Sequence, residues 1–165
     1  MKKILIASTD ETIIDSVQQA CKLYSSYFDP EYYTDTDKII RYIDYELPEI
    51  KVIDFRSTEF DSEHIMSEID IDPWLHYGGI IAIVAGPKEQ KELEDRKNPN
   101  FLIIQTPSAF KMHCARLLKI LWQNQQFLFN RGMQEQLAGK ESGSFVSENN
   151  PLDLKVYAKF LVSYL

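Results

Sequence analysis

The residues best placed for chemistry are an aspartate and a few hydroxyl side chains that follow predicted strands. Asp54 ends a short, mainly apolar run over residues 50–53, and Pro48 precedes that run. Val52 and Ile53 are β-branched and favour a strand, while Pro48 prevents a helix from continuing into it. In open α/β sheets, sites form beyond the carboxyl ends of the strands. We therefore expect Asp54 at such an edge, in a position suited to a reactive carboxylate.

The elements that must position Asp54 alternate between strand and helix. Apolar and β-branched runs predict strands at residues 3–7, 31–33, 50–54, 79–85 and 101–104. Apolar residues at helical spacing predict helices after the first, second and third strands, a charged helix at 88–97 and a last helix from 108. Connections of helix length predict a doubly wound, five-stranded parallel sheet of order 2-1-3-4-5. In that order, Asp54 and the loop after Ala7 face each other across one crevice.

The length, composition and net charge of the chain argue against several classes of protein. The chain has 165 residues and a net charge of −7, which argues against a nucleic-acid partner. No apolar run approaches the length of a membrane span, and the first residues do not form a signal peptide. Cys21 and Cys114 lie far apart in predicted helices, so we expect reduced core thiols in a cytoplasmic protein. No spacing of Cys and His predicts a metal site.

Three of these segments together resemble a response-regulator receiver domain over about residues 1–122. The run ending in Asp54 resembles the family's third strand, which ends in the phosphoaccepting aspartate. Residues 80–85 resemble its fourth strand, and Thr106-Pro107 stands where the family has a Lys-Pro pair. The resemblance implies a flavodoxin-like fold and a non-enzymatic role in a two-component phosphorelay. It makes Asp54 the candidate phosphoacceptor.

The positions that assist phosphorylation in this family carry other residue types here. Where the family has an acid pair after the first strand, this chain has Ser8 and Thr9, and where the family has a hydroxyl after the fourth strand, it has Val84 (or Ala85). The family's lysine corresponds to Thr106, and its aromatic residue in the fifth strand corresponds to Ile103. Only Asp10 is acidic beside the first pair. Losing one such electrostatic group costs about 10²–10³ in rate. We therefore expect a pseudo-receiver that needs no cofactor and works through protein contacts without efficient phosphorylation.

Two alternatives remain open at this point. In the first, Asp54 is a working phosphoacceptor, and Asp10 and Asp54 hold Mg²⁺ in an atypical site, since that cation takes oxygen ligands. In the second, the crevice around Ser8, Thr9, Asp54 and Thr106 senses a small molecule or an anion at a helix start.

The C-terminal third extends beyond a receiver domain. We predict a helical extension and linker over 123–143, then a strand and helix over 144–165. These last residues resemble the start of the ATP-binding domain of anti-sigma-factor-type serine kinases and histidine-kinase ATPases, and they end in mid-helix, as if cut from a longer chain. The expected partner is another protein or such a downstream domain, contacted through the face of the fourth helix, fifth strand and fifth helix.

The long last helix offers a second route to association. Alternating spacings of three and four predict either a coiled-coil seam that makes a homodimer or a face that packs on its own domain. The residues of this seam are Cys114, Leu117, Leu121, Asn124 and Leu128.

Overall fold

The computed structural model describes residues 2–24, 27–72, 75, 78–95 and 102–137, with side chains up to residue 123. Its centre is a five-stranded parallel sheet of order β2-β1-β3-β4-β5, which confirms the predicted order. The strands are β1 (Lys2–Ala7), β2 (Phe28–Tyr33), β3 (Ile50–Asp54), β4 (Gly79–Ile83) and β5 (Leu102–Gln105). Every residue of β3 and β4 is buried, as expected for central strands covered on both faces.

The helices begin where short acidic side chains can cap them. The N-caps Asp10, Asp35 and Asp61 each accept a hydrogen bond from a backbone N–H of the first turn. These residues start α1 (Glu11–Lys22), α2 (Thr36–Glu46) and α3 (Ser62–Ile71). Proline stands at the first position of α5 (Pro87–Glu94) and of α6 (Pro107–Leu137), where its missing N–H costs nothing. The charged helix expected at 88–97 is therefore found as α5.

The second strand is longer than the sequence indicated. The strand predicted at 31–33 is found, but β2 begins earlier, at Phe28, and runs through Asp29 and Pro30. Pro30 lies opposite Ile4 of β1 in this edge strand. An edge strand pairs on one side only, so a proline whose nitrogen faces away from the ladder is tolerated there. Phe28, which is 5% exposed, anchors the start of β2 in the core.

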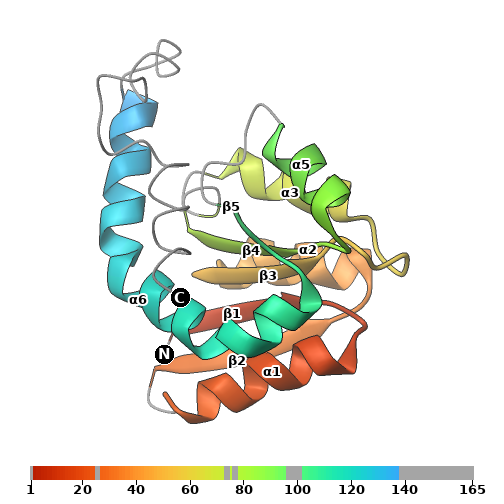
Figure 1. Cartoon of the computed structure of the whole chain (residues 1–165). Coiled ribbons are helices and arrows are strands. Elements are labelled where there is room, and N and C mark those ends of the chain that lie inside the picture. Colours follow the sequence, from red (N-terminus) through yellow and green to blue (C-terminus); the bar gives the residue numbers. More distant parts are fainter. Residues whose placement is uncertain (1, 25–26, 73–74, 76–77, 96–101, 138–165) are drawn as a thin grey trace.

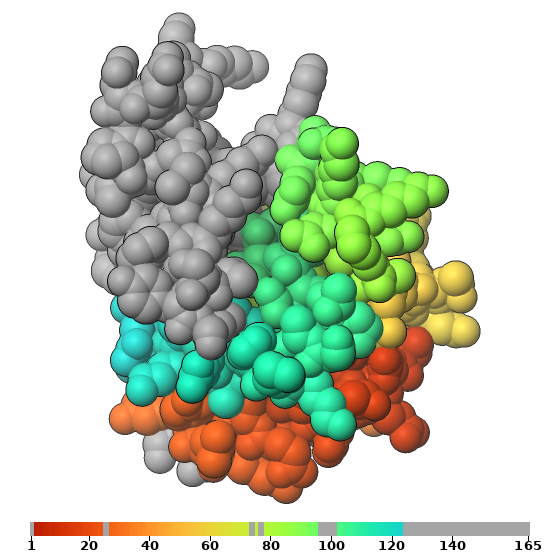
Figure 2. Space-filling view, in the orientation of Figure 1, coloured from red at the N-terminus to blue at the C-terminus, as the bar shows by residue number. Residues whose placement is uncertain are grey.

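Two layers of helices enclose the sheet (Figure 1). On one face, α1 and α6 lie side by side (Figure 2) and pack on even-numbered residues of β1 and β3, such as Ile6 and Val52. On the other face, α2 and α3 cover the odd-numbered residues of those strands, such as Leu5 and Ile53, and α5 packs through Leu93 on Ala82 of β4 (Figure 1). This alternation places the side chain of Asp54 on the same side of the sheet as α1 and α6.

The first half of α6 belongs to the domain core. Cys114, Leu117 and Leu121 are at most 2% exposed and pack against α1 and the sheet. These three positions of the predicted coiled-coil seam therefore face their own domain, while the side chains of Asn124 and Leu128 lie outside the described residues. The helix α6 and the strand β4 approach each other closely at Gly79, where an added Cβ would lie 3.0 Å from Leu121 Cδ1.

Some of the other sequence predictions concern residues outside the described ranges. The predicted strand and helix at 144–165 lie outside the described residues, so the three-part division of the chain stays a prediction. Cys21 and Cys114 are both free and buried. Within the described ranges, no helix combines the length and apolarity needed to cross a bilayer.

Candidate functional site

Asp54 lies at the carboxyl end of β3 and is 2% exposed. Ser8, the first residue after β1, is fully buried and donates its hydroxyl to Asp54 Oδ2 at 2.8 Å. The same Ser8 Oγ accepts a hydrogen bond from the backbone N–H of Asp10 at 3.0 Å. The loop after β1 and Asp54 therefore face each other, and Ser8 joins them through its hydroxyl.

Arg56 dominates the surroundings of Asp54. Its guanidinium donates from Nε to Oδ1 at 2.9 Å and from Nη2 to Oδ2 at 2.8 Å, which makes a bidentate pair. Its backbone N–H also donates to Oδ1 at 3.1 Å. The chain turns back after β3, so that two residues only two positions apart in sequence meet side chain to side chain. Charge-assisted bidentate pairs of this kind are among the strongest polar contacts in proteins.

Asp10 completes the cluster from the opposite loop. Its Oδ2 accepts a hydrogen bond from Arg56 Nη2 at 2.8 Å, and its Oδ1 caps α1 by accepting the Thr12 N–H at 2.8 Å. The hydrogen bond from Arg56 lowers the pKa of the Asp10 carboxyl, and the Thr12 N–H adds to this. The hydrogen bond to Asp54 raises the pKa of Arg56, so one guanidinium stays charged between two carboxylates.

The donor set of this cluster does not suit Mg²⁺. Such an ion needs several oxygens in near-octahedral geometry. Here both carboxylate oxygens of Asp54 accept hydrogen bonds from Arg56, and both of Asp10 are also engaged. The guanidinium is the cation that these two acids share. Within the described ranges, no three His, Cys, Asp or Glu residues are grouped in a way that could hold a metal ion.

The remaining residues predicted from the sequence do not join this cluster. Thr9 is exposed, and Val84 is buried in a small apolar core with Leu93. Thr106 accepts the Phe110 N–H at 2.9 Å through its backbone oxygen, at the start of α6. Among the described residues, neither Thr9 nor Thr106 hydrogen-bonds to Asp54. Arg56, in the loop after β3, is a residue of this site that the sequence patterns do not single out.

A second charged side chain lies inside the sheet. Lys51, in the middle of β3, is 0% exposed, and its Nζ donates to the backbone oxygen of Leu75 at 2.7 Å. Burial lowers the pKa of Lys51 to about 7, although the charges of Glu49 and Asp72 act in the opposite direction. The amine helps to hold the connection before β4, and it lies in the strand that presents Asp54.

Comparison with known proteins bears on the fold. No family model matches the chain, and no curated protein matches it. Solved structures do. A response regulator in red-light signalling of R. palustris is 14% identical, with 71% of this chain and 91% of that chain covered and a TM-score of 0.53.

Two further structures agree. The phosphorylated cyanobacterial phytochrome response regulator is 17% identical, with coverages of 73% and 94% and a TM-score of 0.59. A response regulator from Hahella chejuensis is 10% identical, with coverages of 76% and 95% and a TM-score of 0.59. With the strand order and the layers described above, these matches show that the chain has the receiver-like, flavodoxin-type fold of response regulators.

Proposed function

We propose that this chain is a signalling module of the two-component type, a pseudo-receiver that acts through protein contacts without efficient phosphorylation. The observation that carries the proposal is the bidentate contact between Arg56 and Asp54. The fold is suited to signalling, but the arginine occupies the side-chain atoms that a phosphoacceptor must keep available. In this proposal the module is not an enzyme, works in the cytoplasm and needs no cofactor.

The physical argument concerns the oxygens of Asp54. Attack on a phosphoryl donor requires one carboxylate oxygen to approach phosphorus while cations neutralise the phosphoryl oxygens. Arg56 holds one oxygen through Nε and the other through Nη2, and Ser8 also donates to Oδ2. Attack would require these hydrogen bonds to break inside a site where Asp54 is 2% exposed. Desolvated charge pairs are costly to separate, so the barrier rises before any bond forms.

The other family positions support the same conclusion. A lysine that would pair with a phosphoryl oxygen is replaced by Thr106, which immediately precedes α6. The hydroxyl expected after the fourth strand is replaced by Val84, which is 1% exposed and packed in the core. A phosphoryl group on Asp54 would therefore gain little stabilisation from either position.

The proposed output is contact with a protein partner through α5, β5 and the exposed side of α6. This face follows from the resemblance to receiver domains, and Met112 on α6, which is 77% exposed, offers an apolar contact there. The candidate partners are a downstream ATPase domain of the same protein and a second copy of the chain. Light scattering of the full chain over a dilution series distinguishes them, since only self-association makes the mass depend on concentration. Met112→Glu should weaken any such association, whereas Tyr45→Glu, at an 81% exposed position of α2 outside this face, serves as the matched control.

Phosphorylation is tested directly with acetyl phosphate and Mg²⁺. The full chain is incubated with both, and its intact mass is compared with that of Asp54→Ala and of a competent receiver treated in parallel. We expect no gain of a phosphoryl group in the wild type while the competent receiver gains one. A stable gain that disappears in Asp54→Ala would show that the chain is a working phosphoacceptor and would refute the proposal.

A further inference from the structure

A cavity of about 400 Å³ opens beside the Asp54 cluster, on the opposite side of the sheet. It lies beyond the carboxyl ends of β3 and β4, between the first turn of α3 and the inner side of α5. Apolar side chains contribute to its lining: Phe55, Val84 and Leu93. The rest of the lining is Ala85 and the polar residues Arg56, Ser62, Glu63, Glu89 and Glu92. The lining therefore combines apolar and charged side chains in about equal measure, which suits an amphipathic group.

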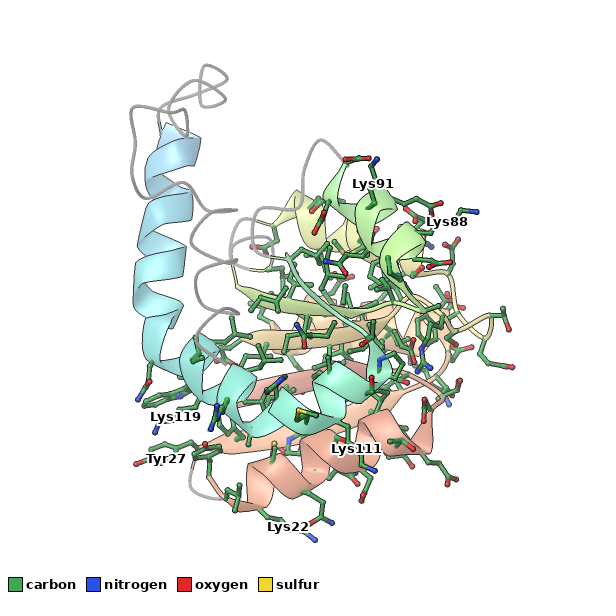
Figure 3. All side chains as sticks on the ribbon, viewed as in Figure 1. Lys22, Tyr27, Lys88, Lys91, Lys111 and Lys119 are labelled. Carbon is green, nitrogen blue, oxygen red and sulfur yellow. The ribbon has the colours of Figure 1, made fainter. Side chains whose placement is uncertain are left out.

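The charge around this cavity is negative and only partly compensated. Glu89 and Glu92 line it from α5, and neither makes an ion pair with a described residue. The two lysines of the same helix, Lys88 and Lys91, project outward from α5 (Figure 3) and make no ion pair within the described ranges. They do not line the cavity.

Arg56 is the one cation among the lining residues, and its charge is already shared. Its guanidinium binds Asp54 and Asp10, so two carboxylates face one positive charge. Little of that charge remains to offset Glu89 and Glu92 across the cavity. A low-dielectric wall focuses such a field, which favours a positively charged occupant and repels an anion.

We propose that this cavity binds an alkylguanidinium or alkylammonium group, the chemistry of an arginine or lysine side chain. The stem would pack on Phe55, the partly exposed apolar side chain of the lining, above the buried Val84 and Leu93, and the cation would reach Glu89 and Glu92. Long basic side chains combine these two parts, since their methylenes bury on apolar surface while the charge stays near polar groups. A metal ion is a poorer occupant, because no group of acids here is arranged to coordinate one within the described residues.

This inference does not rest on the proposed function. The mass measurement with acetyl phosphate involves Asp54, and its outcome is independent of whether the cavity binds a cation. Arg56 does connect the two sites, since it lines the cavity and clamps Asp54. A bound cation and Arg56 carry like charges, so replacing Arg56 by Gln should strengthen cation binding, whereas replacing the glutamates should weaken it.

The test uses the full chain and n-butylguanidinium as the probe. Amide NMR signals of Ala85, Glu89 and Leu93 should shift saturably, with n-butanol as the uncharged comparison. The variant Glu89→Gln/Glu92→Gln should lose about three- to tenfold in affinity, as expected for two partly exposed charge contacts. Glu94→Gln, on the same helix but outside the cavity, should bind like the wild type.

Two results would overturn the proposal. One is the absence of any saturable shift with n-butylguanidinium. The other is equal binding of n-butanol and n-butylguanidinium to the wild type, a comparison that does not depend on whether a variant folds. A capped tripeptide with a central arginine separates the sources of the group. Tighter binding of the peptide indicates a partner's side chain, and tighter binding of the small molecule indicates a free metabolite of this class. Failure of both probes rejects the cation site.

Discussion

Arg56 holds both carboxylate oxygens of Asp54, with Nε 2.9 Å from Oδ1 and Nη2 2.8 Å from Oδ2. The carboxylate is 2% exposed and the arginine side chain 28% exposed, so this ion pair is partly shielded from water. Its energetic role differs from that of a surface pair, which contributes little. Removing either partner leaves a charge or a donor without compensation in the sheet edge.

Arg56→Met should therefore destabilise the chain by about 2–4 kcal/mol, less than a fully buried pair because the arginine is partly exposed. Arg41→Met, at an exposed position of α2, is the control and should change stability by less than about 0.5 kcal/mol. Urea unfolding measures both. The double variant Arg56→Met/Asp54→Asn should recover part of the loss, and a fully additive double variant would contradict the pairing.

Asp10→Asn should separate the ion pair of Asp10 from its capping role. Asparagine caps helices as well as aspartate does, so the variant loses mainly the contact with Arg56. Asp35→Asn is the matched control, because Asp35 caps α2 without an arginine partner among the described residues. We expect Asp10→Asn to cost about 0.5–1 kcal/mol more than the control at neutral pH.

The pH dependence of that difference has a defined sign. The hydrogen bond from Arg56 lowers the folded-state pKa of Asp10. Its contribution is therefore present above the unfolded pKa of about 3.9 and is lost as the pH falls through the lowered folded value. Unfolding curves at decreasing pH should show the gap between the Asn variants closing. A gap that widens in acid would be inconsistent with this contact.

Lys51→Met should stabilise the chain and reduce its dependence on pH. Burial lowers the folded pKa of Lys51 to about 7, whereas the unfolded value is about 10.4. Between these values the unfolded chain binds the extra proton, so wild-type stability should rise with pH by up to about 1.4 kcal/mol per unit. Below about pH 7 the penalty is fully present, and the variant gains most there.

The comparison requires unfolding measurements of wild type, Lys51→Met and Lys38→Met from about pH 6 to about pH 9. Lys38 is an exposed lysine of α2, so its variant should keep the wild-type slope. Glu49 and Asp72 are the acids that favour the charged amine, and they are present in all three proteins. Equal slopes of unfolding free energy against pH in all three proteins would exclude Lys51 as the origin of the pH dependence.

Gly79→Ala should destabilise the contact between β4 and α6 by about 1–2 kcal/mol, since overpacked cores must shift. An added Cβ would lie 3.0 Å and 3.2 Å from the two terminal carbons of Leu121, which is 1% exposed. The cost should shrink in a Leu121→Ala background, and a double-mutant cycle in urea measures this. Gly86→Ala is the sterically open comparison, with its nearest neighbour, Glu89 Oε2, at 3.7 Å.

The fold was accessible from the sequence because its signals are local. Uninterrupted apolar strands, acidic caps and helix-length connections determine a doubly wound sheet with few alternatives. The boundary of β2 was missed because Pro30 acts as a strand breaker in general, and only the edge position makes it acceptable. That position is a property of the whole sheet rather than of residues 28–33.

Only part of the candidate site could be predicted from the sequence. Strand order alone brought Ser8 to Asp54, and this contact is found. Arg56 was missed because side chains two residues apart rarely contact each other. Its contact depends on the turn in which the Ser57 N–H donates to the backbone oxygen of Asp54 at 3.3 Å. Lys51 was missed because a strand pattern does not show whether one amine finds an acceptor such as Leu75. An arginine two residues after a strand-ending acid is the signal to look for.

The tether between Arg56 and Asp54 has a consequence for how this sheet edge responds to its surroundings. A dissociable ion is held by mass action, and dilution or a chelator removes it. A guanidinium attached two residues away is present at a fixed, high effective concentration whatever the composition of the solution. The conformation at this sheet edge is therefore set when the chain folds.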